Sequence, residues 1–203
     1  MSRPSQSTAT YGIRSLLAST LLVLAFTRAD AQTSYAANGN VKTTIQGTSN
    51  IHDWEMTSSN GTSTMTLVMD AAGNLTGISN VGFQMSVKSL KSNHGNQMDN
   101  NAYKAMAADK YESIRFQGTG GTLKGGGGSY TFTVPGKLTI ASGSQNVTLT
   151  ANCKVNTDKS VSIDGSYRLN TNDYNVKPIS IMLGALKTGE FVTIKYGFVA
   201  RPQ

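Results

Sequence analysis

The chain has 203 residues, 38% of them hydrophobic, and a formal net charge of +7 at pH 7. This length and composition fit one domain with a full hydrophobic core. The lysines are scattered singly among Ser, Thr and Asn, without the basic runs and interleaved aromatic residues typical of nucleic-acid-binding proteins. The charge therefore argues against a nucleic-acid partner and supports only a mild, transient contact with an anionic membrane surface.

The first segment has the pattern of a secretory signal peptide. Arg3 and Arg14 precede the apolar run "LLASTLLVLAF", and the small residues of "ADA" follow it. The apolar run is too short for a comfortable membrane span. We therefore expect cleavage after Ala31, which divides the chain into a signal peptide (1–31) and one domain (32–203) that is periplasmic or secreted.

The stretch "NIHDWEM", Asn50 to Met56, contains a histidine, two carboxylates and the only tryptophan of the chain. If it is a strand, period-two alternation places His52, Trp54 and Met56 on one face and the two carboxylates on the other. Adjacent residues then form no acid–base pair. His52 and Trp54 would point inward, either as a core pair or as a polar contact at the mouth of a ligand cavity.

The only other histidine, His94, lies in the loop "KSNHGNQ". Two histidines without an HxH or HExxH motif or a cysteine pair give a weak metal signature, so we expect neither metal nor cofactor. Cys153 has no partner for an internal disulfide and falls on an apolar phase, which predicts a small buried side chain.

Apolar and polar residues alternate with a period of two through most of the remaining chain, which is typical of half-buried strands. Turn signals such as "DAAGN", "GGGG" and "NTDKS" separate the runs at short spacing. The glycine run lacks the Lys-Ser/Thr and helix of a phosphate loop, so we expect a hairpin turn there. The pattern predicts an antiparallel β-sandwich or β-barrel.

Two segments break this pattern. "MDNNAYKAMAADKY", Met98 to Tyr111, has apolar residues at helical spacing and Asp99 in position to cap the amino end, which predicts one short helix. "KPISIMLGAL", Lys177 to Leu186, is apolar on both phases. We expect this second segment to be buried on both sides or to cover an opening.

Several of these stretches together resemble one known family. "GTSNIHDWEM", "MSVKSLKS", "MDNNAYKAMAADKYESIRF" and "GSYRLNTNDYNVKPISI", followed by "EFVTIKYGF", are similar to the YceI-like family of bacterial secreted lipid-binding proteins, from about Val41 to Phe198. The resemblance implies an all-β fold: an extended, lipocalin-like antiparallel barrel of eight strands with one short helix. It also implies that the lumen holds a long polyisoprenoid or fatty chain, and it implies no catalytic residue.

We therefore predict a binding protein and not an enzyme, with a quinone, polyprenyl compound or similar long-chain lipid as its ligand. Methionines on the inward phases suit a cavity that must fit an irregular chain. The predicted ligand-binding residues are His52, Trp54, Met65, Leu67, Phe83, Met85, Val87, Met106, Phe116, Phe132, Leu149, Tyr167, Ile194 and Phe198.

Two other function classes stay open from the residues alone. One is a secreted hydrolase or isomerase that uses His52 or His94, and the other is a structural or adhesive β module, including an outer-membrane barrel. The sequence also leaves open whether the protein is a monomer or a homodimer.

Overall fold

The computed structural model describes residues 31–203, so the predicted signal peptide lies, except for Ala31, outside the described residues. Long strands make up most of this part of the chain: β1 (Ala31–Ser49), β2 (Trp54–Met69), β3 (Leu75–Ser86), β5 (Ser113–Gly126), β6 (Ser129–Ile140), β7 (Gly143–Val155), β8 (Val161–Asn170) and β10 (Leu186–Pro202). Shorter elements lie between them: η1 (Val87–Ser89), β4 (Lys91–Ser92), α1 (Asn96–Ala105), η2 (Thr171–Tyr174), β9 (Ser180–Ile181) and η3 (Met182–Gly184).

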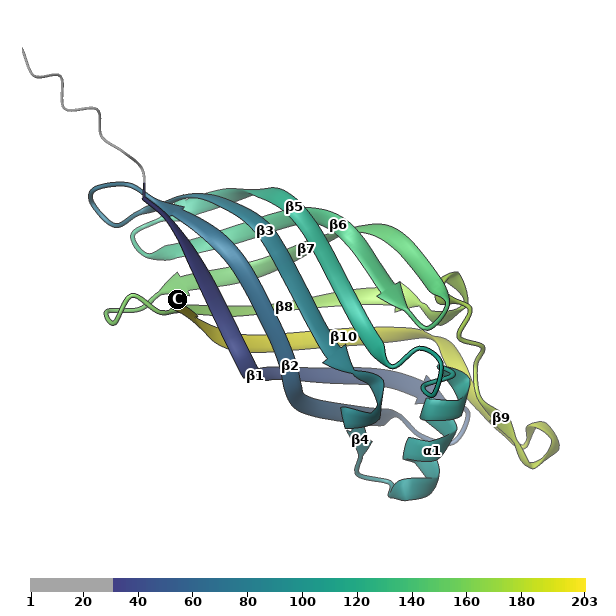
Figure 1. Ribbon diagram of the computed structural model, residues 1–203. Helices are drawn as coiled ribbons and strands as arrows, with labels where there is room; N and C mark the ends of the chain where they lie inside the picture. Colours follow the sequence, from purple (N-terminus) through teal and green to yellow (C-terminus); the bar gives the residue numbers. More distant parts are fainter. Residues whose placement is uncertain (1–30) are drawn as a thin grey trace, which may run out of the picture.

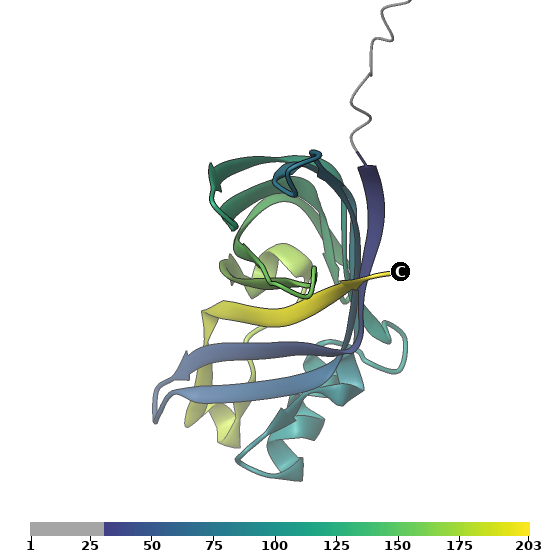
Figure 2. The same ribbon diagram turned by 90° about the vertical axis from the view of Figure 1, so that its left-hand side faces the viewer.

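The eight long strands of residues 31–203 form a closed antiparallel barrel (Figure 1). Their order is β1-β10-β8-β7-β6-β5-β3-β2, and β2 pairs with β1 to close the circle. Seen from one end, the strands curve around a common axis (Figure 2). The predicted fold class is thus confirmed. No helix among the described residues is long and apolar enough to cross a membrane.

Period-two alternation determines which side chains fill the barrel. On β6, Tyr130, Phe132 and Val134 are buried and alternate with more exposed residues. On β7, Cys153 is also buried, as predicted, and burial raises the pKa of its thiol to about 12. The glycine run forms the turn of the β5–β6 hairpin, because Gly127 and Gly128 adopt the positive φ angles that this turn needs.

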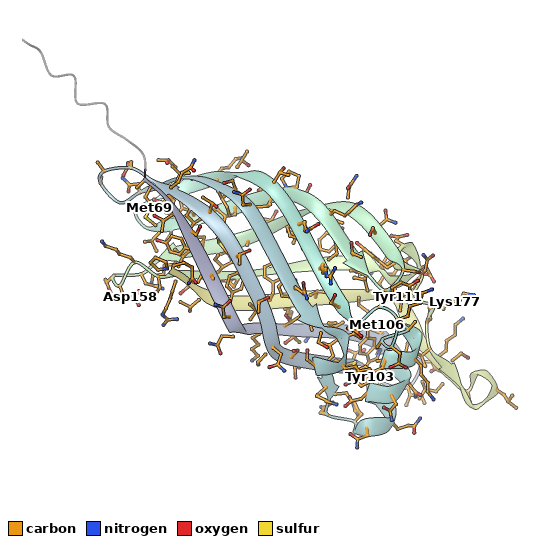
Figure 3. All side chains as sticks on the ribbon, viewed as in Figure 1. Met69, Tyr103, Met106, Tyr111, Asp158 and Lys177 are labelled. Carbon is orange, nitrogen blue, oxygen red and sulfur yellow. The ribbon has the colours of Figure 1, made fainter. Side chains whose placement is uncertain are left out.

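The two ends of the barrel differ. At the end that carries Met69 and Asp158 in Figure 3, Leu67, Leu75 and Val161 are buried and fill the interior. We call this the closed end. At the other end, where Figure 3 labels Tyr103, Met106 and Lys177, α1 and β9 lie beside the strand termini (Figure 1). We call this the helix end.

The predicted helix boundaries and cap were wrong. The helix covers Asn96–Ala105 and not Met98–Tyr111, and Gly95 occupies the cap position without a side-chain hydrogen bond. Asp99 is instead buried: its carboxylate accepts the backbone N–H of Ser92 at 2.8 Å and pairs with Lys91 Nζ at 3.3 Å. The carboxylate therefore ties α1 to β4.

The segment from Lys177 to Leu186 forms a β9–β10 hairpin at the helix end. Its tip residue Leu183 is fully exposed, at 109% of its reference area, so the first of the two predicted alternatives, burial on both sides, is wrong there. Asn50 holds this hairpin to the β1–β2 turn, because its side chain donates to Ala185 O and accepts from Lys187 N, both at 2.9 Å.

Candidate functional site

The barrel encloses an apolar cavity of about 110 Å³, which we call the lumen. Inward side chains of the long strands line it, since alternate residues of each strand point to the axis. Most of the residues predicted from the sequence as ligand-binding lie in its wall: Met65, Phe83, Met85, Phe116, Phe132, Leu149, Tyr167, Ile194 and Phe198.

A second space of about 90 Å³ continues the lumen toward the helix end; we call it the middle chamber. Ile45, Ile114 and Ile194 border both spaces. Met106, at the end of α1, lies in the wall of this chamber and not in the lumen. Thr171 and Lys177 bring polar groups to it.

A third space of about 220 Å³, the outer chamber, adjoins the middle chamber. Trp54, Met56 and Ile179 border both. Of these three spaces, only the outer chamber has His52 and His94 in its wall. Lumen, middle chamber and outer chamber thus follow one another from the barrel interior to the helix end.

Two hydroxyl groups along this path have no hydrogen-bond partner. Thr43, which is 2% exposed, lines the lumen, and its Oγ1 is buried without a partner; the same is true of Thr171 Oγ1 in the middle chamber. By contrast, Ser63 in the lumen wall donates its hydroxyl to Gly82 O at 3.1 Å. An unpartnered buried hydroxyl is costly, so Thr43 and Thr171 are the exceptions in an apolar path.

The barrel wall is weakest between β7 and β8. These strands pair only between Ala151–Val155 and Val161–Gly165, although both continue toward the helix end. Where the pairing stops, the side chain of Tyr196 points inward and its ring lies over Gly165. The Tyr196 hydroxyl donates to Thr150 O at 3.2 Å. Burial, with a smaller effect of Asp164, raises the pKa of Tyr196 to about 12, so the hydroxyl keeps its proton.

The predicted inward position of His52 was wrong. Strand β2 begins only at Trp54, so His52 belongs to the preceding turn and is exposed. Ser49 shapes this turn, since its Oγ donates to His52 O at 2.7 Å and accepts from His52 N at 3.1 Å. These local hydrogen bonds compete with strand pairing.

Trp54 points inward as predicted but does not reach the lumen. It is half-buried, its ring covers Gly47 on β1, and its Nε1 donates to Thr48 O at 2.9 Å. Two further predicted residues, Leu67 and Val87, are completely buried but line none of the three spaces, because Leu67 fills the closed end and Val87 lies in η1.

Sequence reasoning missed one wall of the lumen. Val41, Thr43 and Ile45 on β1 all line it. Apolar residues alternate there with a period of two, but Thr43 interrupts the apolar face and Gly39 lies at a bulge. The sequence pattern therefore indicates a strand only weakly in this segment. A search for alternation that tolerates one Thr would have found it.

The structure brings the two histidines together, which the sequence did not predict. Their rings stack with centroids 4.7 Å apart and an interplanar angle of 22°. Among the described residues, neither ring bonds a carboxylate, and no group of three His, Cys, Asp or Glu side chains is placed to hold a metal ion.

Comparison with known families identifies the fold. The family description "YceI-like domain" matches residues 3–200, which is nearly the whole chain. The chain belongs to the YceI-like family. None of the curated proteins matches it.

Two solved structures show the same YceI-like fold. BcnA of Burkholderia cenocepacia is 18% identical with a TM-score of 0.59, and the match covers 79% of this chain and 96% of BcnA. A domain from Saccharophagus degradans is 8% identical with a TM-score of 0.62, over 85% of this chain and 100% of that domain. The latter is described as a polyisoprenoid-binding domain implicated in plant cell wall breakdown.

Proposed function

We propose that this protein is a periplasmic or secreted carrier that holds one long isoprenoid chain, or a similar lipid, in the lumen of its barrel. The observation that carries the proposal is the apolar lumen, which the middle chamber and then the outer chamber adjoin toward the helix end. Family membership and the polyisoprenoid-binding description of the Saccharophagus degradans domain support it.

Burial of the chain supplies the binding energy. Each buried CH₂ group contributes about 0.8 kcal/mol, from which the ordering of the chain and the loss of its free motion are subtracted. A lumen of about 110 Å³ is smaller than the roughly 300–1,000 Å³ of typical ligand pockets. Side chains must therefore move on binding, and Met65 and Met85 are suited to this because thioether side chains are flexible.

The proposed location rests on the amino-terminal pattern alone. If residues 1–31 act as a signal peptide, the mature protein begins at Gln32. Cell fractionation and amino-terminal sequencing should find this residue first in the extracytoplasmic fraction. A first residue upstream of Ala31 in a membrane fraction would mean that the segment is retained as an anchor.

We further propose that the helix end touches the membrane surface when the lipid is exchanged. Two of the exposed large hydrophobic residues, Ile51 and Leu183, project from the β1–β2 turn and the β9–β10 hairpin, which Asn50 holds together. Lys177 and Lys187 on the same segment are exposed and suit anionic head groups. The outer chamber lies beside this surface, since Leu186 of the hairpin lines it.

The lumen can be blocked without touching the surface. We expect Met85→Trp to abolish lipid uptake while the barrel survives, because overpacking a core costs about 1–3 kcal/mol. Gln84→Trp is the matched control: Gln84 is the neighbouring, outward residue of β3. Native mass spectrometry of the protein purified from its own host measures the bound lipid, and circular dichroism checks the fold. Equal lipid content in a folded Met85→Trp variant would place the ligand outside the lumen.

A further inference from the structure

The outer chamber has more polar residues in its wall than the lumen or the middle chamber. In the almost entirely apolar lumen wall, the hydroxyl groups of Ser63 and Tyr196 have backbone partners, and that of Thr43 has none. The outer chamber, in contrast, has six polar residues among the apolar ones in its wall: Ser49, His52, His94, Gln97, Asn101 and Thr188. A lipid whose tail fills the lumen would therefore place its polar head among these side chains.

The turn before β2 fixes the hydrogen-bonding role of His52. Its Nδ1 lies 2.7 Å from Asp53 O, and a carbonyl oxygen only accepts, so Nδ1 carries a hydrogen. In the neutral ring, Nε2 is then an acceptor. The stacked ring of His94, 4.7 Å away, supports the orientation of the His52 ring. His52, which lines the outer chamber, thus offers an acceptor to a ligand that has a hydrogen to donate.

Neighbouring polar groups leave donors free in the same wall, and Asn101 is one of them. Trp54 Nε1 already donates to Thr48 O, and Ser49 Oγ to His52 O. Gln97 Nε2 donates to Asn101 Oδ1 at 3.2 Å, while Asn101 Nδ2 has no partner within the part of the chain that the structure describes. A hydroxyl group could donate to His52 and accept from Asn101, which a carbonyl or an ether could not do.

The charge of the chamber points to an uncharged head. None of the described residues that line the outer chamber is Lys, Arg, Asp or Glu. The cation of the path, Lys177, is exposed and lines the middle chamber, as does the unpartnered Thr171 hydroxyl. A phosphate head group would be expected at Lys177, whereas a neutral hydroxyl is matched by His52.

We propose that the outer chamber is a head-group subsite for an uncharged, hydroxyl-bearing lipid such as a prenol, a prenylated phenol or a hydroquinone, with His52 Nε2 as the acceptor. This inference rests on the proposed function, because it takes the tail to lie in the lumen. His94 positions His52 and does not itself bond the head.

The test compares two probes with the same tail, geranylgeraniol and geranylgeranyl methyl ether, which lacks the donated hydrogen. Isothermal titration or displacement of a fluorescent lipid measures both affinities. The loss of one hydrogen bond predicts that the wild-type protein binds the alcohol about three- to tenfold more tightly. His52→Phe keeps the stacked ring and should abolish this preference. His94→Phe should retain the preference.

Other results would overturn the inference. Equal binding of both probes by the wild-type protein would remove the subsite but leave the lumen as the site of the tail. Loss of the preference in His94→Phe with its retention in His52→Phe would show that His52 Nε2 does not set it. Loss of the preference for the alcohol in Thr171→Val would place the head group in the middle chamber. Tighter binding of geranylgeranyl phosphate than of the alcohol would do the same. Binding of neither probe would count against the proposed function itself.

Discussion

Thr43 shows at the scale of one residue how the lumen departs from an ordinary core. Its hydroxyl lies in an apolar wall without a partner. Because a buried unpaired hydroxyl has lost its hydration without compensation, the nearly isosteric Thr43→Val should raise the free energy of unfolding by about 1 kcal/mol. Urea denaturation followed by Trp54 fluorescence measures this change.

Ser63 is the control for this prediction. It lies in the same wall, but its hydroxyl donates to Gly82 O. Ser63→Ala should therefore lower the free energy of unfolding, by about 0.5–1.5 kcal/mol. If Thr43→Val is as destabilising as Ser63→Ala, the Thr43 hydroxyl has a partner after all.

Among the secondary-structure elements, α1 depends on one buried carboxylate. Burial acts to raise the pKa of Asp99, but the hydrogen bond from Ser92 N and the ion pair with Lys91 outweigh it and lower this pKa below the ordinary value of 3.8. A carboxyl group whose pKa is lower in the folded state stabilises that state above its unfolded pKa. This contribution is lost as the pH falls through the lowered value.

Hydrogen exchange of α1 should follow this titration. In the wild-type protein, the protection factors of residues 96–105 should decrease as the pH is lowered below 3.8. Asp99→Asn should remove most of this pH dependence. Asp109→Asn is the control, since Asp109 forms an exposed ion pair with Lys88 and such pairs contribute little. An unchanged pH dependence in Asp99→Asn would mean that another group anchors the helix.

Viewed as a whole molecule, the barrel has a surface at its helix end that should recognise membranes. Leu183→Ser should reduce binding to vesicles of phosphatidylglycerol and phosphatidylcholine about tenfold, since an inserted leucine side chain contributes about 1.5–3 kcal/mol. Vesicle sedimentation measures the bound fraction. Val199→Ser is the control, because Val199 is an exposed aliphatic residue of the barrel wall on β10. An equal loss of vesicle binding in both variants, or no loss in either, would contradict a membrane contact at the helix end.

The sequence predicts the barrel better than it predicts the mouth of the site. Alternation in β6 and in the second half of β3 is a strong signal, because both faces of a barrel wall impose the same period on every strand. His52 was misplaced because the hydrogen bonds of Ser49 form a turn, so that β2 begins at Trp54 and not at Asn50 as the alternation suggests. The His52–His94 stack joins two loops distant in the sequence, and periodicity carries no information about such a contact.

The central claim is that the apolar tail of a long lipid lies inside the barrel, with its last isoprene unit nearest the closed end. A long prenol that carries a diazirine on its last isoprene unit tests this most directly, with photolysis and mass spectrometric mapping of the labelled peptides. The account predicts adducts on residues deep in the lumen, such as Phe132 and Ile163, and their loss in Met85→Trp. Adducts on outward residues of the strands, or on outer-chamber residues such as Met98, would contradict it.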